Sequence, residues 1–230
     1  MPLSELNGIA PSGAVRPHLD GNISLSELKL HEFTENVAAD SPAPGGGSVA
    51  GFTAAIGAAL GLMAARLTQN RKKYESFAAH AAEVESRLET LRTEALGLME
   101  QDCAAFKKVS AAFDMPKETE GERAKRGAAI QEGLKACTET PLRLMELCAE
   151  GLNLVESMLG RCNDTCVSDL AMSALSLKAA LQGAWLNVSV NISWLKDSAF
   201  AGSCRDRGTA LLAAAEIADR CYEEVLKSYE

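Results

Sequence analysis

One long apolar seam constrains the fold of this sequence more than any other feature. Between residues 77 and 112 the seam positions recur in alternate steps of four and three, the spacing of a helix packed lengthwise on its neighbours. These positions are Phe77, Ala81, Val84, Leu88, Leu91, Ala95, Leu98, Asp102, Ala105, Val109 and Ala112. Ten of the eleven are apolar, and the exception is Asp102. The pattern predicts a long helix inside a helical bundle.

A second seam of the same kind follows later in the chain. It consists of Leu170, Ala174, Leu177, Leu181, Ala184, Val188, Asn191 and Leu195. A single polar residue, Asn191, interrupts it. Aromatic residues make up only 5% of the chain, and this low content favours packed helices over sheet. We therefore expect an all-α fold, an elongated up-and-down bundle of about six to eight helices with no strand.

Local signals give the expected helix boundaries. Ser24-x-x-Glu27 and Thr119-x-x-Glu122 have the spacing of capping boxes, which begin helices. Pro141 either kinks a helix or begins a fresh one capped by Thr140. Residues 1–22 mix proline and glycine without periodicity, so we expect a flexible N-terminal arm followed by a single helical domain over residues 23–230.

Charge and cysteine usage narrow the class of protein. The net charge of −8 argues against nucleic acid or an anionic membrane as the main partner. Seven cysteines without a Cys-x-x-Cys pair predict free thiols in the cytoplasm and no metal site. The arm lacks the pattern of a signal peptide. The uncharged run Val49 to Ala65 is short for a membrane span, so we expect a buried helix there.

The stretch Ser41 to Ser48, SPAPGGGS, precedes this apolar run. The prolines hold the chain extended, the glycines free the backbone, and Ser48 is expected to cap the helix that follows. The bare N–H groups at such a helix start suit a carboxylate, a phosphate or an electron-rich ring edge. The alternative is that the stretch is only a turn between two helices.

The polar residues on the two seams are the candidates for chemistry. Desolvation would raise the pKa of Asp102 and allow it to take and give a proton. Alternatively, Asp102 pairs with a buried cation, or acts with Asn191 to fix helix register. Asn187 lies one turn before Asn191, so the two amides share a face. Such amides bind either a ligand or neighbouring backbone groups.

Three separated motifs together resemble one known family. They are Ser41 to Ala50; Glu100 to Ala112 followed by Met115-Pro116-Lys117 and Thr119; and Ser168-Asp169 with Gly183 to Val188 and Asn191. From about residue 24 to the C-terminus the chain resembles the cyclodeaminase/cyclohydrolase family of folate one-carbon enzymes. This family includes the C-terminal half of the bifunctional formiminotransferase-cyclodeaminase and stand-alone bacterial proteins.

The resemblance implies an all-helical homodimer that acts on a tetrahydrofolate derivative as its substrate, with no bound cofactor. In a cyclodeaminase, N10 of 5-formimidoyltetrahydrofolate attacks the formimidoyl carbon, and ammonia leaves to give 5,10-methenyltetrahydrofolate. Other members, the cyclohydrolases, add water to the methenyl form. We expect the first activity here, with the second as the alternative on the same site. Both reactions pass through a tetrahedral carbon between N5 and N10.

The resemblance also assigns roles to residues. Asp102 is the expected acid/base. We expect the backbone of Gly45, Gly46, Gly47 and Ser48 to hold a glutamate carboxylate or the polar edge of the pterin. Asn187 and Asn191 would bind the pterin, and Asp169 would orient them or cap its own helix. Lys73, with Lys72 and Arg161, is a candidate for binding a polyglutamyl tail.

A protein of another class remains an alternative. A non-enzymatic helical interaction protein would explain both seams, because each would bury the helix of a partner. It would not explain why each seam is interrupted by one residue capable of hydrogen bonding. A serine hydrolase fits less well, because the segment around Ser48 lacks the last glycine of a nucleophile elbow and no strand precedes it.

Overall fold

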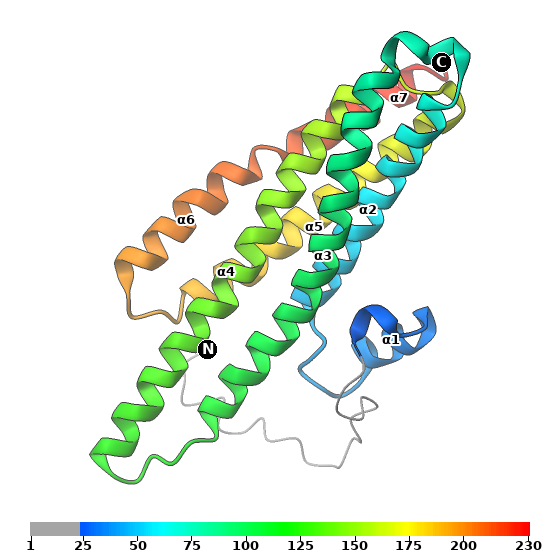
Figure 1. Cartoon of the computed structure of the whole chain (residues 1–230). Coiled ribbons are helices and arrows are strands. Elements are labelled where there is room, and N and C mark those ends of the chain that lie inside the picture. The colour runs from blue at the N-terminus through cyan, green and yellow to red at the C-terminus, as the bar shows by residue number, and fades with distance from the viewer. Residues whose placement is uncertain (1–23) are drawn as a thin grey trace.

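Four long helices form the body of the molecule in a computed structural model that describes residues 24–230 (Figure 1). The helices are α1 (Leu30–Ala38), α2 (Gly46–Gln69), α3 (Ala78–Phe113), α4 (Glu120–Met158), α5 (Val167–Ile192), α6 (Ser198–Leu212) and α7 (Ala215–Lys227). Residues 24–230 contain these seven α-helices, three short 3-10 turns and no strand. The predicted all-α bundle is confirmed. The expected arm at residues 1–22 lies outside the described residues.

The long helices α2 to α5 run up and down the bundle. Helix α2 packs on α3 and α5, α4 packs on the same two helices, and α6 and α7 cover α4 and α5. Helices α3 and α4 extend as a hairpin beyond the end of the bundle where α2 begins (Figure 1). The short helix α1 lies beside the start of α2, so several segments meet at this end of the molecule.

Both predicted seams face the core. On α3, Val84, Leu88 and Ala95 are fully buried. On α5, every seam residue from Leu170 to Val188 is fully buried as well. The polar exceptions, Asp102 and Asn191, are half-buried. The seams therefore fix the bundle, and their two polar members lie where the packing opens.

Helix α2 packs closely because its small residues leave room for neighbours. A Cβ on Gly57 would lie 2.9 Å from the side chain of Leu177, and the hydroxyl of Ser173 donates to the carbonyl of Gly57 at 2.6 Å. By length and composition α2 could also cross a membrane, but 61% of its most apolar window is buried inside the bundle. It is the central core helix, as expected for the run Val49 to Ala65.

Of the two predicted capping boxes, one is confirmed and the other is wrong. The Thr119 capping box is confirmed, with the Thr119 N–H donating to Glu122 at 2.8 Å. The Ser24 box is wrong: a single 3-10 turn, Leu25–Glu27, follows, because the Ser24 hydroxyl donates to Glu100 on α3 instead of capping a helix.

Pro141 begins no fresh helix. Helix α4 continues through it from Glu120 to Met158, and the hydroxyl of Thr140 donates to the carbonyl of Ala136 instead of serving as a cap. A proline inside a helix removes one hydrogen bond, normally donated to the carbonyl four residues earlier. Here that carbonyl belongs to Cys137.

Candidate functional site

The start of α2 lies directly against Asp102 on α3. Gly45 is the N-cap residue and Gly46 the first helical residue, so Ser48 is the third residue of the helix. The expectation that Ser48 caps α2 is therefore wrong. Instead, its hydroxyl points into the bundle and donates to Oδ2 of Asp102 at 2.9 Å. The sequence motif and the carboxylate on the seam form one site.

Gly47 makes this approach sterically feasible. A Cβ on Gly47 would lie 2.1 Å from Oδ1 of Asp102 and 2.5 Å from its Cγ. Only a residue without a side chain can stand there while Asp102 keeps its position. The carboxylate therefore lies over the first turn of α2, where N–H groups without partners inside the helix and the helix dipole favour negative charge.

Burial and a neutral hydroxyl, and no charged partner among the described residues, set the electrostatic environment of Asp102. Burial raises the pKa of its carboxyl, and the hydroxyl and backbone N–H of Ser48 oppose this increase. None of the ion pairs formed within residues 24–230 includes Asp102. Within the described residues, Asp102 therefore does not pair with a buried cation, which was one of the alternatives for its role. A carboxyl group with a raised pKa can exchange protons close to neutral pH.

Asn187 on α5 borders the same loop. Its Nδ2 lies 3.7 Å from the point where a Cβ on Gly46 would stand, and it donates to the carbonyl of Gly183 at 2.9 Å. Gly46 is exposed to solvent. The bare first turn of α2, Asp102 and Asn187 thus form one group from three helices.

Asn191 has a partner that sequence reasoning missed. Its Nδ2 donates at 2.7 Å to the carbonyl of Cys137, the group that Pro141 leaves without an intrahelical donor. Asn191 therefore replaces the missing hydrogen bond of α4 from the neighbouring helix α5. The signal was available in the sequence, because Pro141 follows Cys137 by four residues. The contact joins α5 to α4, so it fits the predicted role of Asn191 in fixing helix register better than the predicted role in binding the pterin.

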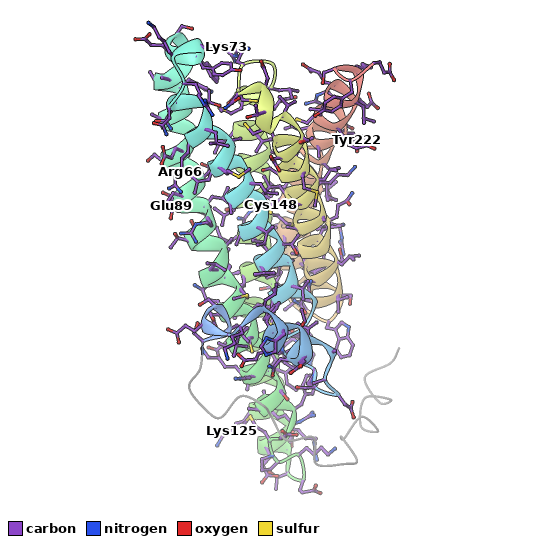
Figure 2. All side chains as sticks on the ribbon, turned by 90° about the vertical axis from the view of Figure 1, so that its right-hand side faces the viewer. Arg66, Lys73, Glu89, Lys125, Cys148 and Tyr222 are labelled. Carbon is purple, nitrogen blue, oxygen red and sulfur yellow. The ribbon has the colours of Figure 1, made fainter. Side chains whose placement is uncertain are left out.

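Lys73 and Asp169 do not join this group within one chain. Lys73 forms an ion pair with Asp164 beyond the end of α2, and Figure 2 shows it at the end of the bundle opposite to α1. Asp169 lies in the first turn of α5, where an acidic side chain suits the helix dipole. Asn187 is eighteen residues further along, which corresponds to about 27 Å at the rise of an α-helix.

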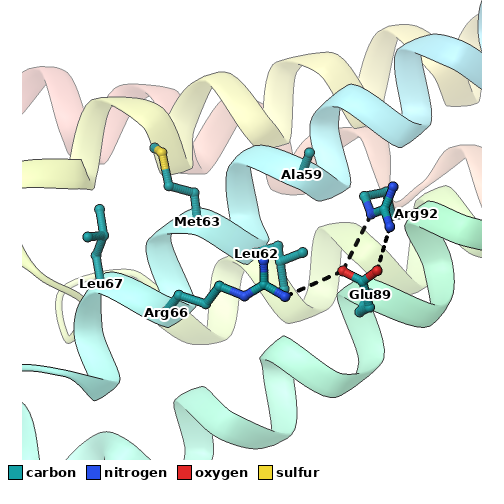
Figure 3. Close-up of a pocket in the computed structure, with 7 residues that line it drawn as sticks. All are labelled: Ala59, Leu62, Met63, Arg66, Leu67, Glu89 and Arg92. Atoms are coloured by element: carbon teal, nitrogen blue, oxygen red, sulfur yellow. Dashed lines mark hydrogen bonds and ion pairs between the residues drawn. The ribbon is translucent and has the colours of Figure 1, made fainter.

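A groove lies elsewhere on the molecule, between α2 and α3. It has a volume of about 490 Å³ and is lined by Ala59, Leu62, Met63, Arg66, Leu67, Glu89 and Arg92. Figure 3 shows Arg66 from α2 and Arg92 from α3 converging on Glu89, with Met63 and Leu67 beside them. No residue predicted for the site lines this groove.

Comparison with known proteins decides the family. The profile of a family described as formiminotransferase-cyclodeaminase matches residues 29–210, which is most of the chain and includes every residue of the group around Asp102. The chain belongs to the formiminotransferase-cyclodeaminase family. The resemblance of the three motifs is thereby confirmed. The chain is a folate one-carbon enzyme, either a cyclodeaminase or a methenyltetrahydrofolate cyclohydrolase, and the family acts on tetrahydrofolate derivatives.

Individual members of the formiminotransferase-cyclodeaminase family differ in length. The methenyltetrahydrofolate cyclohydrolase of Methylorubrum extorquens is 38% identical over 197 residues, which cover 85% of this chain and 95% of that protein. The formimidoyltransferase-cyclodeaminase of Rattus norvegicus is 33% identical over 193 residues, which cover 84% of this chain but only 36% of the rat protein. The chain thus spans about a third of that bifunctional relative.

The fold of this family member also matches a crystal structure. The formiminotetrahydrofolate cyclodeaminase of Thermotoga maritima superposes with a TM-score of 0.77 at 27% sequence identity, covering 88% of this chain and 96% of that one. The formiminotransferase-cyclodeaminase fold is therefore shared over nearly the whole described bundle.

Proposed function

We propose that the protein is a methenyltetrahydrofolate cyclohydrolase in which Asp102 moves protons at the carbon between N5 and N10. The observation that carries the proposal is the Ser48–Asp102 pair, a carboxyl with a raised pKa and no cation partner in the described chain, held over a bare helix start. The relative from Methylorubrum extorquens, similar in length, favours the hydrolytic reaction. The sequence motifs led us to expect a cyclodeaminase first and a cyclohydrolase as the alternative, and this proposal reverses that preference.

The proposed hydration uses one carboxyl group twice. Water adds to the methenyl carbon of the cationic substrate, and the Asp102 carboxylate takes the proton that this water loses. In the tetrahedral intermediate the hydroxyl group on the former methenyl carbon then loses its proton as the carbon–N5 bond breaks, and N5 takes a proton from Asp102. The product is 10-formyltetrahydrofolate, with one proton released overall.

Cyclodeamination is the second candidate, favoured by the match to the Thermotoga maritima structure. In that reaction N10 attacks the formimidoyl carbon of the 5-formimidoyl derivative, and N10 loses its proton. The amino group on the tetrahedral carbon gains a proton and leaves as ammonia. Asp102 would serve both steps from the same position, so the two candidates differ in the leaving group and not in the residue that moves protons.

The geometry suggests which part of the substrate meets the glycine loop. The N–H groups of Gly46 and Gly47 have no partner inside the helix, but the Asp102 carboxylate already lies over that turn. A glutamate carboxylate placed there would meet a like charge. We therefore propose that Gly45 to Ser48 and Asn187 bind the neutral polar edge of the pterin.

We also propose that the protein works as a homodimer through the outer face of α2 and α5. These helices lie side by side, and six of their large apolar residues are exposed. They are Ile56, Met63, Leu67, Met172, Leu186 and Val190. Burial in a second copy would remove this apolar surface from water. Sedimentation equilibrium should give a dimer that Met63→Glu weakens; a monomeric wild type at micromolar concentration would contradict this.

We also propose a cytoplasmic location, because the seven cysteines are free thiols, as is usual in a reducing compartment.

The methenyl chromophore tests the activity. Purified protein is given 5,10-methenyltetrahydrofolate in one cuvette and 5-formimidoyltetrahydrofolate in another. Loss of chromophore faster than the spontaneous rate in the first cuvette identifies a cyclohydrolase. Appearance of chromophore together with ammonia in the second identifies a cyclodeaminase. No change in either cuvette, with folded protein, would contradict the proposed function.

A further inference from the structure

The hydroxyl of Ser48 lies between two hydrogen-bond acceptors. Its side chain is fully buried. The hydroxyl oxygen lies 2.9 Å from Oδ2 of Asp102 and 3.3 Å from the carbonyl oxygen of Met99, one turn before Asp102 on α3. A hydroxyl has one proton to donate and can accept as well. Ser48 can therefore donate to only one of these two acceptors at a time.

We propose that Ser48 is a positioning residue whose hydroxyl turns between Asp102 and the Met99 carbonyl as Asp102 loses and gains a proton. This inference rests on the proposed function only for its catalytic consequence. While Asp102 is ionised, the Ser48 hydroxyl donates to Oδ2. When the proton sits on Oδ2, the carboxyl donates to the Ser48 oxygen and the Ser48 hydroxyl donates to Met99. When it sits on Oδ1, Ser48 keeps donating to Oδ2.

The turning hydroxyl keeps Oδ2 hydrogen-bonded in every protonation state. An unpaired buried polar group is destabilising, so without Ser48 one of the protonation states would be disfavoured. Ser48 itself gains and loses no proton in the cycle. Because Gly47 offers no side chain and Ser48 offers the only side-chain hydrogen bond found for Asp102 in residues 24–230, these two residues together fix where the carboxyl lies.

Other groups around Asp102 leave its titration undisturbed. The thiols that feel the charge of Asp102 are Cys103 on α3 and Cys137 on α4, and Glu100 and Lys107 on α3 act in turn on Cys103. Burial raises the pKa of Cys137 to about 11 and also raises that of Cys103, so both thiols stay neutral around pH 7. The groups that α2 and α5 bring, Ser48 and Asn187, do not titrate in this range.

Ser173 provides a matched control. Like Ser48 it is fully buried, and its hydroxyl donates to the carbonyl of Gly57 at 2.6 Å in the middle of the bundle. Ser48→Ala and Ser173→Ala each remove one buried hydroxyl, but only Ser48→Ala removes a partner of Asp102. Any effect of lost packing alone should be similar in the two variants.

The experiment is a carbon-13 NMR titration of the Asp102 carboxyl in the free protein, assigned by its absence in Asp102→Asn. We expect Ser48→Ala to move the titration of Asp102 to higher pH, and Ser173→Ala to leave it in place. Where Ser48→Ala does not fold, Ser48→Cys, a weaker donor, should move it in the same direction. A folded Ser48 variant that titrates as the wild type overturns the inference.

Kinetics add a readout of the catalytic consequence. At pH 6 we expect kcat/KM of Ser48→Ala to fall about tenfold, as for the loss of one hydrogen bond to a charged group, and to recover partly as pH rises. The NMR titration needs no substrate. A shifted titration in a protein inactive on both folates would keep the role of Ser48 and reject the proposed function, whereas an active enzyme with an unshifted titration would do the reverse.

Discussion

The two ends of the bundle hold two aspartates in opposite states. At one end Asp102 is half-buried, has a neutral hydroxyl as its side-chain partner, and has a pKa raised by burial. At the other end the side chain of Asp164 is 71% exposed, is paired with Lys73, and has a pKa lowered mainly by that contact. Within residues 24–230, the same residue type is a half-buried carboxyl without a charged partner at one end and a surface ion at the other.

The difference lies in what each helix end offers. The start of α2 presents bare backbone because Gly45, Gly46 and Gly47 carry no side chains, and the carboxylate approaches the helix itself. At the opposite end the connections are tied by side chains: Asn163 donates from its backbone to Thr68 at 2.9 Å, and Tyr74 accepts from the backbone of Asp164. In the part of the chain that is described, one end leaves backbone groups without side-chain partners, and the other is closed by its own side chains.

Exchanging each aspartate for its amide should give the largest contrast between the two ends. Asp102→Asn removes the proposed proton carrier, so we expect kcat to fall about 10²–10⁴-fold. Asp164→Asn should leave kcat unchanged, because this side chain lies at the far end of the bundle. Steady-state assays of both variants measure the contrast. Equal losses in the two variants would show that Asp102 has no special role.

Adding one methyl group to the glycine loop should separate two neighbouring positions. Gly47→Ala places a Cβ against the Asp102 carboxyl and must displace it, so activity should fall about 10²-fold. In Gly46→Ala the nearest atom to the new Cβ is 3.7 Å away, so the carboxyl keeps its position. This variant isolates the contact with substrate, and we expect KM to rise while kcat changes little.

Gly97→Ala is the control for the effect of alanine on helix stability, because a Cβ there meets no atom within 4 Å. It should raise the free energy of unfolding by about 0.5–1 kcal/mol and leave both kinetic constants alone. If Gly47→Ala retained wild-type activity, the close approach of Asp102 to α2 would not matter for catalysis.

A double-mutant cycle tests the link between Pro141 and Asn191. Asn191→Leu leaves the Cys137 carbonyl without a donor and should lower the free energy of unfolding by about 1–3 kcal/mol. In the Pro141→Ala background the restored N–H can bond that carbonyl, so the same replacement should cost less. Denaturant unfolding of the four proteins gives the coupling. Additive costs would mean that Asn191 does not compensate for the proline.

The pH dependence of stability should have opposite signs at the two ends. The folded pKa of Asp102 is raised above its ordinary value of 3.8, so its contribution to stability is present at low pH and lost as pH rises through the folded pKa. As pH rises from 4 to 8, the Tm of Asp102→Asn should therefore increase relative to the Tm of the wild type.

For Asp164 the pKa is lowered, so its contribution is present above the ordinary pKa and lost as pH falls. The Tm of Asp164→Asn should approach that of the wild type on acidification. Thermal unfolding from pH 3 to 8 checks both slopes. Parallel curves of Tm against pH for the wild type and Asp102→Asn would contradict a buried Asp102 carboxyl with a raised pKa.

Removing the cation at the far end should have the smallest effect. The side chain of Lys73 is 67% exposed, and exposed ion pairs contribute little to stability. We expect Lys73→Ala to leave kcat, KM for a monoglutamyl folate and Tm unchanged within error. A rise in KM confined to polyglutamyl substrates would restore Lys73 as a contact for the tail, reached from a second copy of the chain.

Most of the fold and part of the candidate site could be predicted from the sequence. Periodicity located both seams and singled out Asp102 and Asn191, because a polar residue on a buried helix stripe needs a partner. The family motifs joined Asp102 to the glycine loop. The rise of an α-helix could also have shown that Lys73, twenty-nine residues before Asp102 and next to the same long helix, lies about 40 Å away.

Other features depended on details that periodicity does not encode. Whether Ser48 caps α2 or faces the core depends on a shift of the helix start by three residues, and three adjacent glycines allow either. Whether Pro141 ends a helix depends on a donor from another helix, and Asn191 supplies it only after α4 and α5 have packed. Tertiary contacts decide both outcomes.

The pH profile of methenyl chromophore loss, measured for wild type and Asp102→Asn and corrected for the spontaneous rate, tests the central claim most directly. If the Asp102 carboxylate takes the proton of the attacking water, the wild-type rate rises with pH through the pKa of Asp102, and this rise is absent in the slow Asp102→Asn protein. A folded Asp102→Asn that turns over at the wild-type rate, with the same rise, would contradict the assignment of Asp102 as the acid/base.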